Sequence, residues 1–180
     1  MHTFSLSAIA IGLLIWFNLA EAGNLIDTAT SAGSFKTFLT CVKNAGLSES
    51  LKTQGPFTIF APSDEAFQKL PRSVMKALMR DKVQLAQLLS HHIVPGKILV
   101  AEVKPGAITT IQGDTVTLTS DNGKVTIDGA NVTQSDLSAD NGVIQVIDTV
   151  MLPKQILSSD HAKIGTTLIR AVQSLSKGGP

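Results

Sequence analysis

Apolar residues recur at helical spacing over roughly residues 24–92, and they alternate with polar residues beyond residue 105. Five segments of the first region have the pattern of amphipathic helices or helical turns: residues 24–32, 34–45, 62–67, 71–79 and 82–91. Ser34 fits an N-cap, Gly46 fits the residue after a helix end, and Pro71 suits a first turn. The amino-terminal half of the chain is therefore predicted to be largely helical.

Strand patterns interrupt and follow these helices. They are the apolar run 57–61, the hairpin 115–127 around the turn signal Asp121-Asn-Gly123, and the apolar run 143–147. The last run is apolar at nearly every position, which is typical of a strand covered on both faces. Together the patterns predict one α+β domain over residues 23–153.

Residues 1–22 have the pattern of a signal peptide. The apolar run from Leu6 to Phe17 is shorter than the roughly 20 residues that a spanning helix needs. Ala20-Glu21-Ala22 fits the small residues that signal peptidase accepts, so cleavage is expected after Ala22. The segment before the run has no Lys or Arg, which leaves an uncleaved anchor as the alternative. The mature protein is expected to be secreted, either outside the cell or into a bacterial periplasm.

Residues 154–180 are predicted to form a C-terminal amphipathic helical tail. Five apolar residues recur there at helical spacing: Ile164, Leu168, Ala171, Val172 and Leu175. The tail has four basic residues and one acidic residue, net +3, whereas residues 23–153 have 11 basic and 12 acidic residues, net −1. A basic amphipathic helix can contact a membrane, but four cations are few. Packing of the tail against the domain is therefore the favoured interpretation.

Composition narrows the class of protein. Of 180 residues, 43% are hydrophobic and 16% charged, which argues against a disordered chain and a nucleic-acid binder. Aromatic residues make up 4%, too few for a surface on which bases stack. Cys41 is the one cysteine, so the chain has no intramolecular disulfide and no thiolate metal cluster. Cys41 falls within the helical pattern 34–45 and is expected in the core.

The sequence lacks a recognisable catalytic constellation. His91, His92 and Asp148 suggest a triad or a metal site, but adjacent residues on a helix point about 100° apart and do not chelate naturally. Ser63 and Ser90 lie in no G-x-S-x-G motif. The Asp- and Gly-containing turns lack the spacing of calcium loops. We therefore expect no enzyme, no metal and no cofactor.

Asn131-Val-Thr133 is an N-glycosylation sequon. Such triplets also arise by chance, and the site has meaning only in a eukaryotic secretory pathway. Asn131 is therefore a glycosylation candidate.

Three segments, in order, resemble the conserved motifs of the fasciclin domain of secreted and surface adhesion proteins. They are residues 55–67, from Gly-Pro-Phe-Thr-Ile-Phe to Glu-Ala-Phe; residues 88–96, Leu-Leu-Ser-His-His-Ile-Val-Pro-Gly; and residues 141–153, from Asn-Gly-Val-Ile to Met-Leu-Pro. The resemblance covers about 130 residues, Asn24 to Pro153. It implies a β-sandwich or wedge with a helical layer formed largely by the amino-terminal half.

The central motif departs from the family pattern. His91-His92 stands where the family usually has Tyr-His, and the chain has no Tyr. The resemblance implies integrin binding around this motif in animal members, which the missing phenol argues against here. The candidates for partner binding are His91, His92, Ile93, Val94, Pro95 and Gly96. Asp64 and Asp148 are expected to be structural, with Asp64 hydrogen-bonded to His92.

Two functions remain open for the chain. The first is an adhesion module that binds an extracellular protein or polysaccharide. The second is a soluble carrier of an apolar small molecule such as a carotenoid or lipid, as in some single-domain members of the family. Apolar residues around Pro95-Gly96 would then line a groove, although core strand is the favoured role for them: Ile93, Val94, Ile98, Leu99 and Val100.

Overall fold

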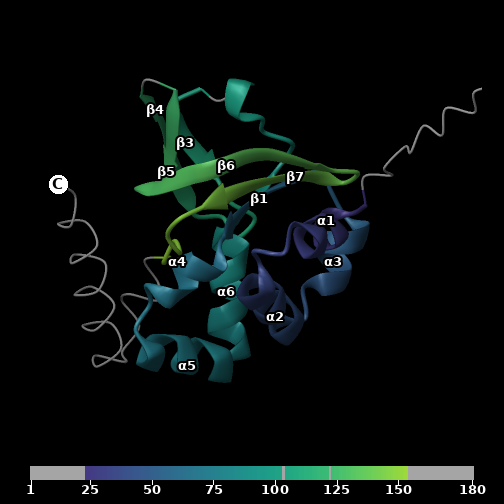
Figure 1. Ribbon diagram of the computed structural model, residues 1–180, viewed down its shortest axis with the longest axis vertical. Coiled ribbons are helices and arrows are strands. Elements are labelled where there is room, and N and C mark those ends of the chain that lie inside the picture. Colours follow the sequence, from purple (N-terminus) through teal and green to yellow (C-terminus); the bar gives the residue numbers. More distant parts are fainter. Residues whose placement is uncertain (1–22, 103, 122, 154–180) are drawn as a thin grey trace, which may run out of the picture.

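The computed structural model describes residues 23–102, 104–121 and 123–153 (Figure 1). The predicted signal peptide 1–22 and the predicted C-terminal helix 154–180 lie outside the described residues. The α-helices are α1 (Leu25–Ala32), α2 (Lys36–Ala45), α3 (Ser48–Thr53), α4 (Asp64–Gln68), α5 (Arg72–Arg80) and α6 (Lys82–His91). The strands are β1 (Phe57–Pro62), β2 (Ile93–Pro95), β3 (Gly106–Thr109), β4 (Thr115–Asp121), β5 (Lys124–Ile127), β6 (Ala130–Ala139) and β7 (Gly142–Ile147), and a 3₁₀-helix, η1, covers Val100–Glu102.

Most of the predicted elements are present. The helix over 82–91 has the predicted bounds, and the predicted hairpin is formed by β4 and β5. Gly46 ends α2 with a φ of +76°, as its position predicted. The predicted N-cap at Ser34 is wrong, because Phe35 holds that position and offers no capping side chain.

The strands form one sheet in the order β2-β1-β7-β6-β5-β4-β3. The neighbouring strands β1 and β7 are parallel, and every other pair is antiparallel. The sheet curls until its ends meet, where the N–H of Ile111 donates to the carbonyl of Ile93 at 2.9 Å. The α+β class is confirmed, but the strands form one nearly closed sheet where the resemblance implied a sandwich or wedge.

The sheet separates two apolar cores. The larger core lies under the helices, which gather on one side of the sheet (Figure 1), and it takes Ile59 of β1 and Ile144 of β7. The smaller core lies inside the curled sheet and takes Phe60 and Ile147 from the same two strands. Because successive residues of a strand point to opposite faces, a strand between two cores is apolar at most of its positions. This explains why residues 143–147 are apolar except at Gln145.

Cys41 lies in the larger core, as predicted, and it is fully buried on α2. Burial raises the pKa of its thiol to about 11, so the reactive thiolate is disfavoured.

No helix in the part of the chain that the structure describes is long and apolar enough to cross a membrane.

The turn between β6 and β7 fastens the helices to the sheet. Asn141 Oδ1 accepts the N–H of Leu25 at 2.8 Å, at the start of α1. Its Nδ2 donates to the carbonyls of Leu51 and Gln54, at 2.8 and 2.7 Å, at the end of α3. Gly142 follows, and a Cβ there would collide with the carbonyl oxygen of Phe57 on β1. The sequence Asn-Gly therefore holds three elements together in addition to making a turn.

Candidate functional site

The central motif His91–Gly96 lies where α6 ends and β2 begins. His91 is the last residue of α6 and His92 is its C-cap. The side chains from His91 to Val94 are at most 4% exposed, whereas Pro95 is exposed and Gly96 is half-buried. Most of the motif therefore shapes the interior, and only its carboxyl end reaches the surface.

His92 is fixed by hydrogen bonds at both ring nitrogens. Its Nε2 accepts the backbone N–H of Met151 at 3.0 Å, so the proton must lie on Nδ1, which donates to the carbonyl of Leu88 at 2.7 Å. Complete burial lowers the pKa of His92 to about 4, although the bond to Leu88 opposes this shift. The neutral ring ties the end of α6 to the chain that follows β7.

The predicted hydrogen bond between His92 and Asp64 is wrong. The Asp64 carboxylate instead accepts the backbone N–H groups of Thr37 at 2.8 Å and Lys36 at 3.3 Å, in the first turn of α2. Burial alone would raise the pKa of Asp64, but the hydrogen bonds from Thr37 and Lys36 hold it below its ordinary value. Asp64 therefore caps a helix that is far from it in the sequence.

Asp148 follows β7 and holds Asn131 near the start of β6. Its carboxylate accepts the backbone N–H of Asn131 at 2.9 Å and the side-chain Nδ2 at 2.8 Å. Burial alone would raise the pKa of Asp148, but the hydrogen bonds from Asn131 and Thr149 and the charge of Lys69 hold it below its ordinary value. Nδ2 of Asn131, the atom that would carry a glycan, is thus half-buried and already hydrogen-bonded.

His91 occupies a separate polar pocket formed with two turns. Its Nδ1 lies 3.5 Å from Oδ2 of Asp114, and its Nε2 lies 3.9 Å from Oδ2 of Asp128. Burial lowers the pKa of His91, while the charges of Asp128 and Asp114 oppose the shift. Oγ1 of Thr110 and Oε1 of Gln112 are buried without a hydrogen bond among the described residues.

The two histidines do not act as a pair of ligands. Their ring centroids are 6.4 Å apart and the ring planes meet at 83°. Among residues 23–102, 104–121 and 123–153, no three His, Cys, Asp or Glu side chains gather in an arrangement that could hold a metal ion. The geometry therefore serves packing and hydrogen bonding.

Four of the five apolar residues proposed for a groove are divided between the two cores, and the fifth, Leu99, is half-buried and belongs to neither. Ile93 packs in the larger core and Val94 in the smaller one, and Ile98 and Val100 lie half-buried against the smaller core. Thr58 of β1 fixes the loop between them, because its Oγ1 donates to the carbonyl of Gly96 at 2.7 Å and accepts the N–H of Ile98 at 2.9 Å. Ile93, Val94, Ile98 and Val100 therefore serve as core residues or pack against the core.

Gln145 and Asp136 also hold the loop that follows Gly96, and neither role was predicted from the sequence. Gln145 is 2% exposed, and its Nε2 donates to the carbonyl of Ile98 at 3.0 Å and to Oδ1 of Asp136 at 2.8 Å. Oδ1 of Asp136 also accepts the N–H of Val100 at 3.0 Å. The available signal was Gln145 itself, the single polar residue within the apolar run 143–147.

A cleft of about 470 Å³ lies between the helical layer and strands β6 and β7. It brings Asp64 and Asp148 to one place, together with these other lining residues: Gly33, Ser34, Ser63, Glu65, Lys69, Thr133, Gln134 and Val146. Both carboxylates are already used by the backbone of α2 and by Asn131. The cleft is therefore lined by acidic groups that serve the fold.

The chain belongs to the fasciclin family, because the family model described as "Fasciclin domain" matches residues 33–153. This confirms the resemblance found in the three motifs.

Relatives of similar length occur in a cyanobacterium. Protein sll1483 of Synechocystis sp. is 40% identical over 135 residues, which are 74% of this chain and 75% of the relative. Uncharacterized protein sll1735 of the same organism is 37% identical over 130 residues, 72% of this chain and 97% of the relative. Human periostin is 33% identical over 145 residues, but the match covers 77% of this chain and 17% of periostin. This chain thus corresponds to a small part of periostin and to most of the cyanobacterial proteins.

A solved structure supports the fold. A domain pair from the insect cell adhesion molecule fasciclin I has a TM-score of 0.64 and 20% sequence identity, over 74% of this chain and 52% of that one. At this level of identity the likeness concerns the fold alone.

Proposed function

We propose that this protein is an exported, non-catalytic interaction module that binds an extracellular protein or polysaccharide. Membership of the fasciclin family supports this. Export rests on the signal-peptide pattern of residues 1–22, with cleavage after Ala22.

One observation carries the non-catalytic part of the proposal. His92 is the best candidate for a base in the central motif, and both of its nitrogens are hydrogen-bonded inside the protein. A general base needs a free nitrogen within reach of a substrate proton. Asp64 and Asp148 are likewise used by backbone N–H groups. His92, Asp64 and Asp148 therefore stabilise the domain, and other residues, on the surface of the domain, recognise a partner.

The central motif acts on recognition indirectly in this proposal. His91, His92, Ile93 and Val94 are buried, so they cannot contact a partner without unfolding. They fix the place of the exposed Pro95 and of the loop after Gly96, which Thr58 and Gln145 also hold. A partner at this end of β2 would meet a rigid surface, and rigidity reduces the entropy lost on binding.

Binding of protein-coated beads to source cells and their extracellular material tests the proposal. Beads that carry the purified mature protein should bind more than albumin beads, and soluble protein should compete. Beads no better than albumin beads, with protein shown by circular dichroism to be folded, would refute the adhesion role.

The same preparation tests the carrier function. The protein is incubated with a carotenoid or a lipid and then passed through a gel-filtration column with absorbance detection. We expect the chromophore to elute apart from the protein, because four of the five residues proposed for a groove pack in or against the two cores. Stoichiometric co-elution would establish a carrier instead.

Glycosylation of Asn131 is a separate proposal for a eukaryotic host. Treatment with a glycosidase should then lower the mass of the secreted protein, and Thr133→Ala should abolish that shift. Thr133→Ala leaves the bonds between Asn131 and Asp148 in place, so it separates the sequon from the structural role of Asn131.

A further inference from the structure

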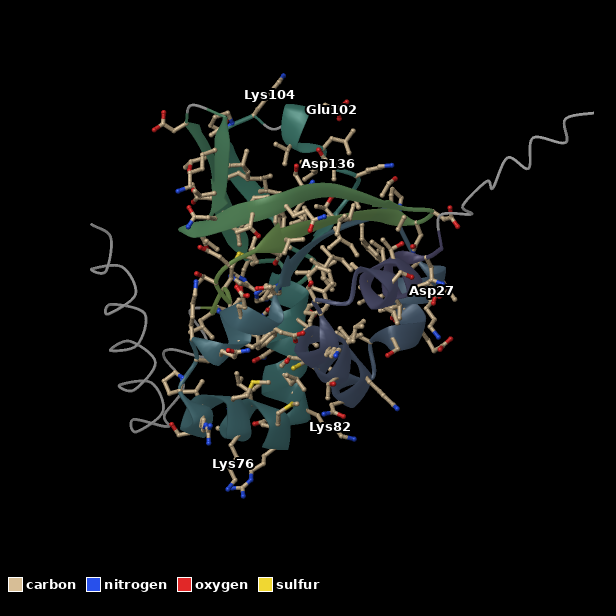
Figure 2. All side chains as sticks on the ribbon, viewed as in Figure 1. Asp27, Lys76, Lys82, Glu102, Lys104 and Asp136 are labelled. Atoms are coloured by element: carbon tan, nitrogen blue, oxygen red, sulfur yellow. The ribbon has the colours of Figure 1, made fainter. Side chains whose placement is uncertain are left out.

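Helix α5 carries a row of cations on its outer face. Arg72, Lys76 and Arg80 are four residues apart, so they lie on one side of the helix, and all three are exposed. Val74 and Leu78 are buried on the other side, against the larger core. Lys82, the exposed first residue of α6, lies at the same end of the molecule as Lys76 (Figure 2). We refer to Arg72, Lys76, Arg80 and Lys82 as the basic face.

The basic face reflects an uneven distribution of charge in the domain. Residues 69–82 hold five of the 11 Lys and Arg of residues 23–153, but only one of the 12 Asp and Glu. Figure 2 shows Lys76 and Lys82 at the end of the molecule opposite Glu102 and Asp136. A domain with net charge −1 therefore presents a strongly positive end.

These cations have no partner in the part of the protein that the structure describes. None of the four forms a salt bridge with a described residue. The nearest acid in the sequence, Asp81, accepts the N–H groups of Val83 and Gln84 as the N-cap of α6, at 3.0 and 3.1 Å. The basic face is thus free to bind an external anion.

We propose that the basic face binds a linear anionic polysaccharide outside the cell. This deepens the proposed function and rests on it, because it names the class of partner. Successive cations on α5 are spaced about 6 Å apart along the helix axis, from a rise of 1.5 Å per residue. That spacing is close to the length of one sugar unit, so successive charged sugars can meet successive cations. The two Arg side chains can bind sulfate or carboxylate groups through two N–H donors each.

A polysaccharide fits this face better than a membrane does. A helix that binds a membrane surface exposes large apolar side chains beside its cations. The apolar side chains of α5 are buried or half-buried, and Val83 of α6, 68% exposed, is the one large exposed apolar side chain at this end among the described residues. The basic face therefore presents positive charge but not the large exposed apolar side chains that would insert into a membrane.

Affinity chromatography of the full mature protein tests the proposal. The columns carry dextran sulfate, polygalacturonate or neutral dextran, so that sulfate, carboxylate and sugar alone are compared. One variant carries Arg72→Gln, Lys76→Gln and Arg80→Gln. Its matched control carries Lys97→Gln, Lys104→Gln and Lys124→Gln, which remove the same charge from exposed positions elsewhere. The basic tail 154–180 is the same in all three proteins, so a difference in retention between them does not come from the tail.

We expect the native protein to bind at least one anionic column at low salt and to pass through neutral dextran. The α5 variant should bind about tenfold more weakly, and the control variant should stay within about twofold of the native protein. Unchanged melting temperatures would show that both variants fold, because the replaced side chains are exposed.

Three results would overturn the proposal. They are equal weakening in both variants, no retention of the native protein at low salt, and binding to vesicles of anionic phospholipid without binding to either anionic polysaccharide. The binding of protein-coated beads to source cells distinguishes a wrong polysaccharide site from a wrong interaction-module function. If the α5 variant still binds cells as the native protein does, the module function stands and the polysaccharide site is wrong.

Discussion

Nε2 of His92 accepts the backbone N–H of Met151, 3.0 Å away, in a fully buried contact between the end of α6 and the segment after β7. The two residues are 59 positions apart in the chain. The bond therefore closes the domain between its middle and its carboxyl end, and it gives the second histidine of the central motif a structural role.

Removal of the His92 ring should strongly lower the free energy of unfolding of the domain. His92→Ala deletes two hydrogen bonds, leaves the N–H of Met151 buried without a partner and opens a cavity, so we expect the free energy of unfolding to fall by about 3 kcal/mol. Urea denaturation followed by circular dichroism measures this. Lys82→Ala, an exposed change on the same helix, should stay within about 0.5 kcal/mol of the native protein. A loss below about 1 kcal/mol for His92→Ala would contradict the role.

The same histidine should make the domain sensitive to mild acid. Burial lowers its pKa from 6.5 to about 4, so the unfolded chain takes up the proton more readily than the folded one. The stability contributed by the neutral ring is complete above about pH 6.5 and is lost as the pH falls to about 4, by up to about 3 kcal/mol. Burial also lowers the pKa of His91, which acts in the same direction.

Urea denaturation at a series of pH values measures this slope. His92→Ala should remove most of the fall between pH 6.5 and 4, and the remainder belongs to His91 and, close to pH 4, to Asp64 and Asp148. A variant whose stability follows pH as steeply as the native protein would show that another group is responsible.

Asp64 should stabilise α2 although it lies outside it. Asp64→Ala leaves the N–H groups of Lys36 and Thr37 without their acceptor, at a cost of about 1 to 2 kcal/mol in the free energy of unfolding. Glu65→Ala, at the exposed neighbouring position, should cost less than about 0.5 kcal/mol. Because the pKa of Asp64 is lowered, its contribution is present above the ordinary value of 3.8 and disappears as the pH falls through the lowered pKa. Equal losses in the two variants would argue against capping.

Gly142 should tolerate no side chain. A Cβ at this position meets the backbone oxygen of Phe57, and neither strand can shift without breaking the parallel pair of β1 and β7. Gly142→Ala should therefore cost about 3 kcal/mol or more, or prevent folding. Gly129→Ala is the matched control, because Gly129 also has a positive φ but has open space around it, and it should cost about 1 kcal/mol. Melting temperatures of the two variants compare them directly.

The sequence predicted the elements whose residues have a clear local pattern. Residues 82–91 have helical spacing and end before Pro95-Gly96, and 115–127 alternate around a turn signal, so their structure follows from neighbours in the chain. Helix α3 and strands β2, β3 and β6 were not among the predicted elements. Helix α3, β2 and β3 are short, and α3 buries only Leu51, so packing from distant elements determines them. Strand β6 is longer, but most of its side chains are exposed or half-buried, so it has no clear apolar pattern.

The contacts within the site could not be predicted in the same way. Ser34 has the right type for an N-cap, but Asp64, 27 residues after Thr37, supplies the acceptor. His92 was assigned a carboxylate partner, whereas it bonds to two backbone groups, and no residue type marks a backbone partner in advance. Only a buried polar residue in an apolar run, as Gln145 is, signals such a contact in the sequence.

The closure between Ile111 and Ile93 has a consequence for how copies of this domain meet. An open sheet offers unpaired backbone groups at its edge strands, where another chain can add a strand and start an aggregate. Here the N–H of Ile111, just after β3, bonds to the carbonyl of Ile93 on β2, and these two outermost strands lie near each other. The closure thus reduces the unpaired backbone that the sheet offers to a neighbouring copy, so crowding of the domain on a surface should favour contacts between side chains over the addition of strands.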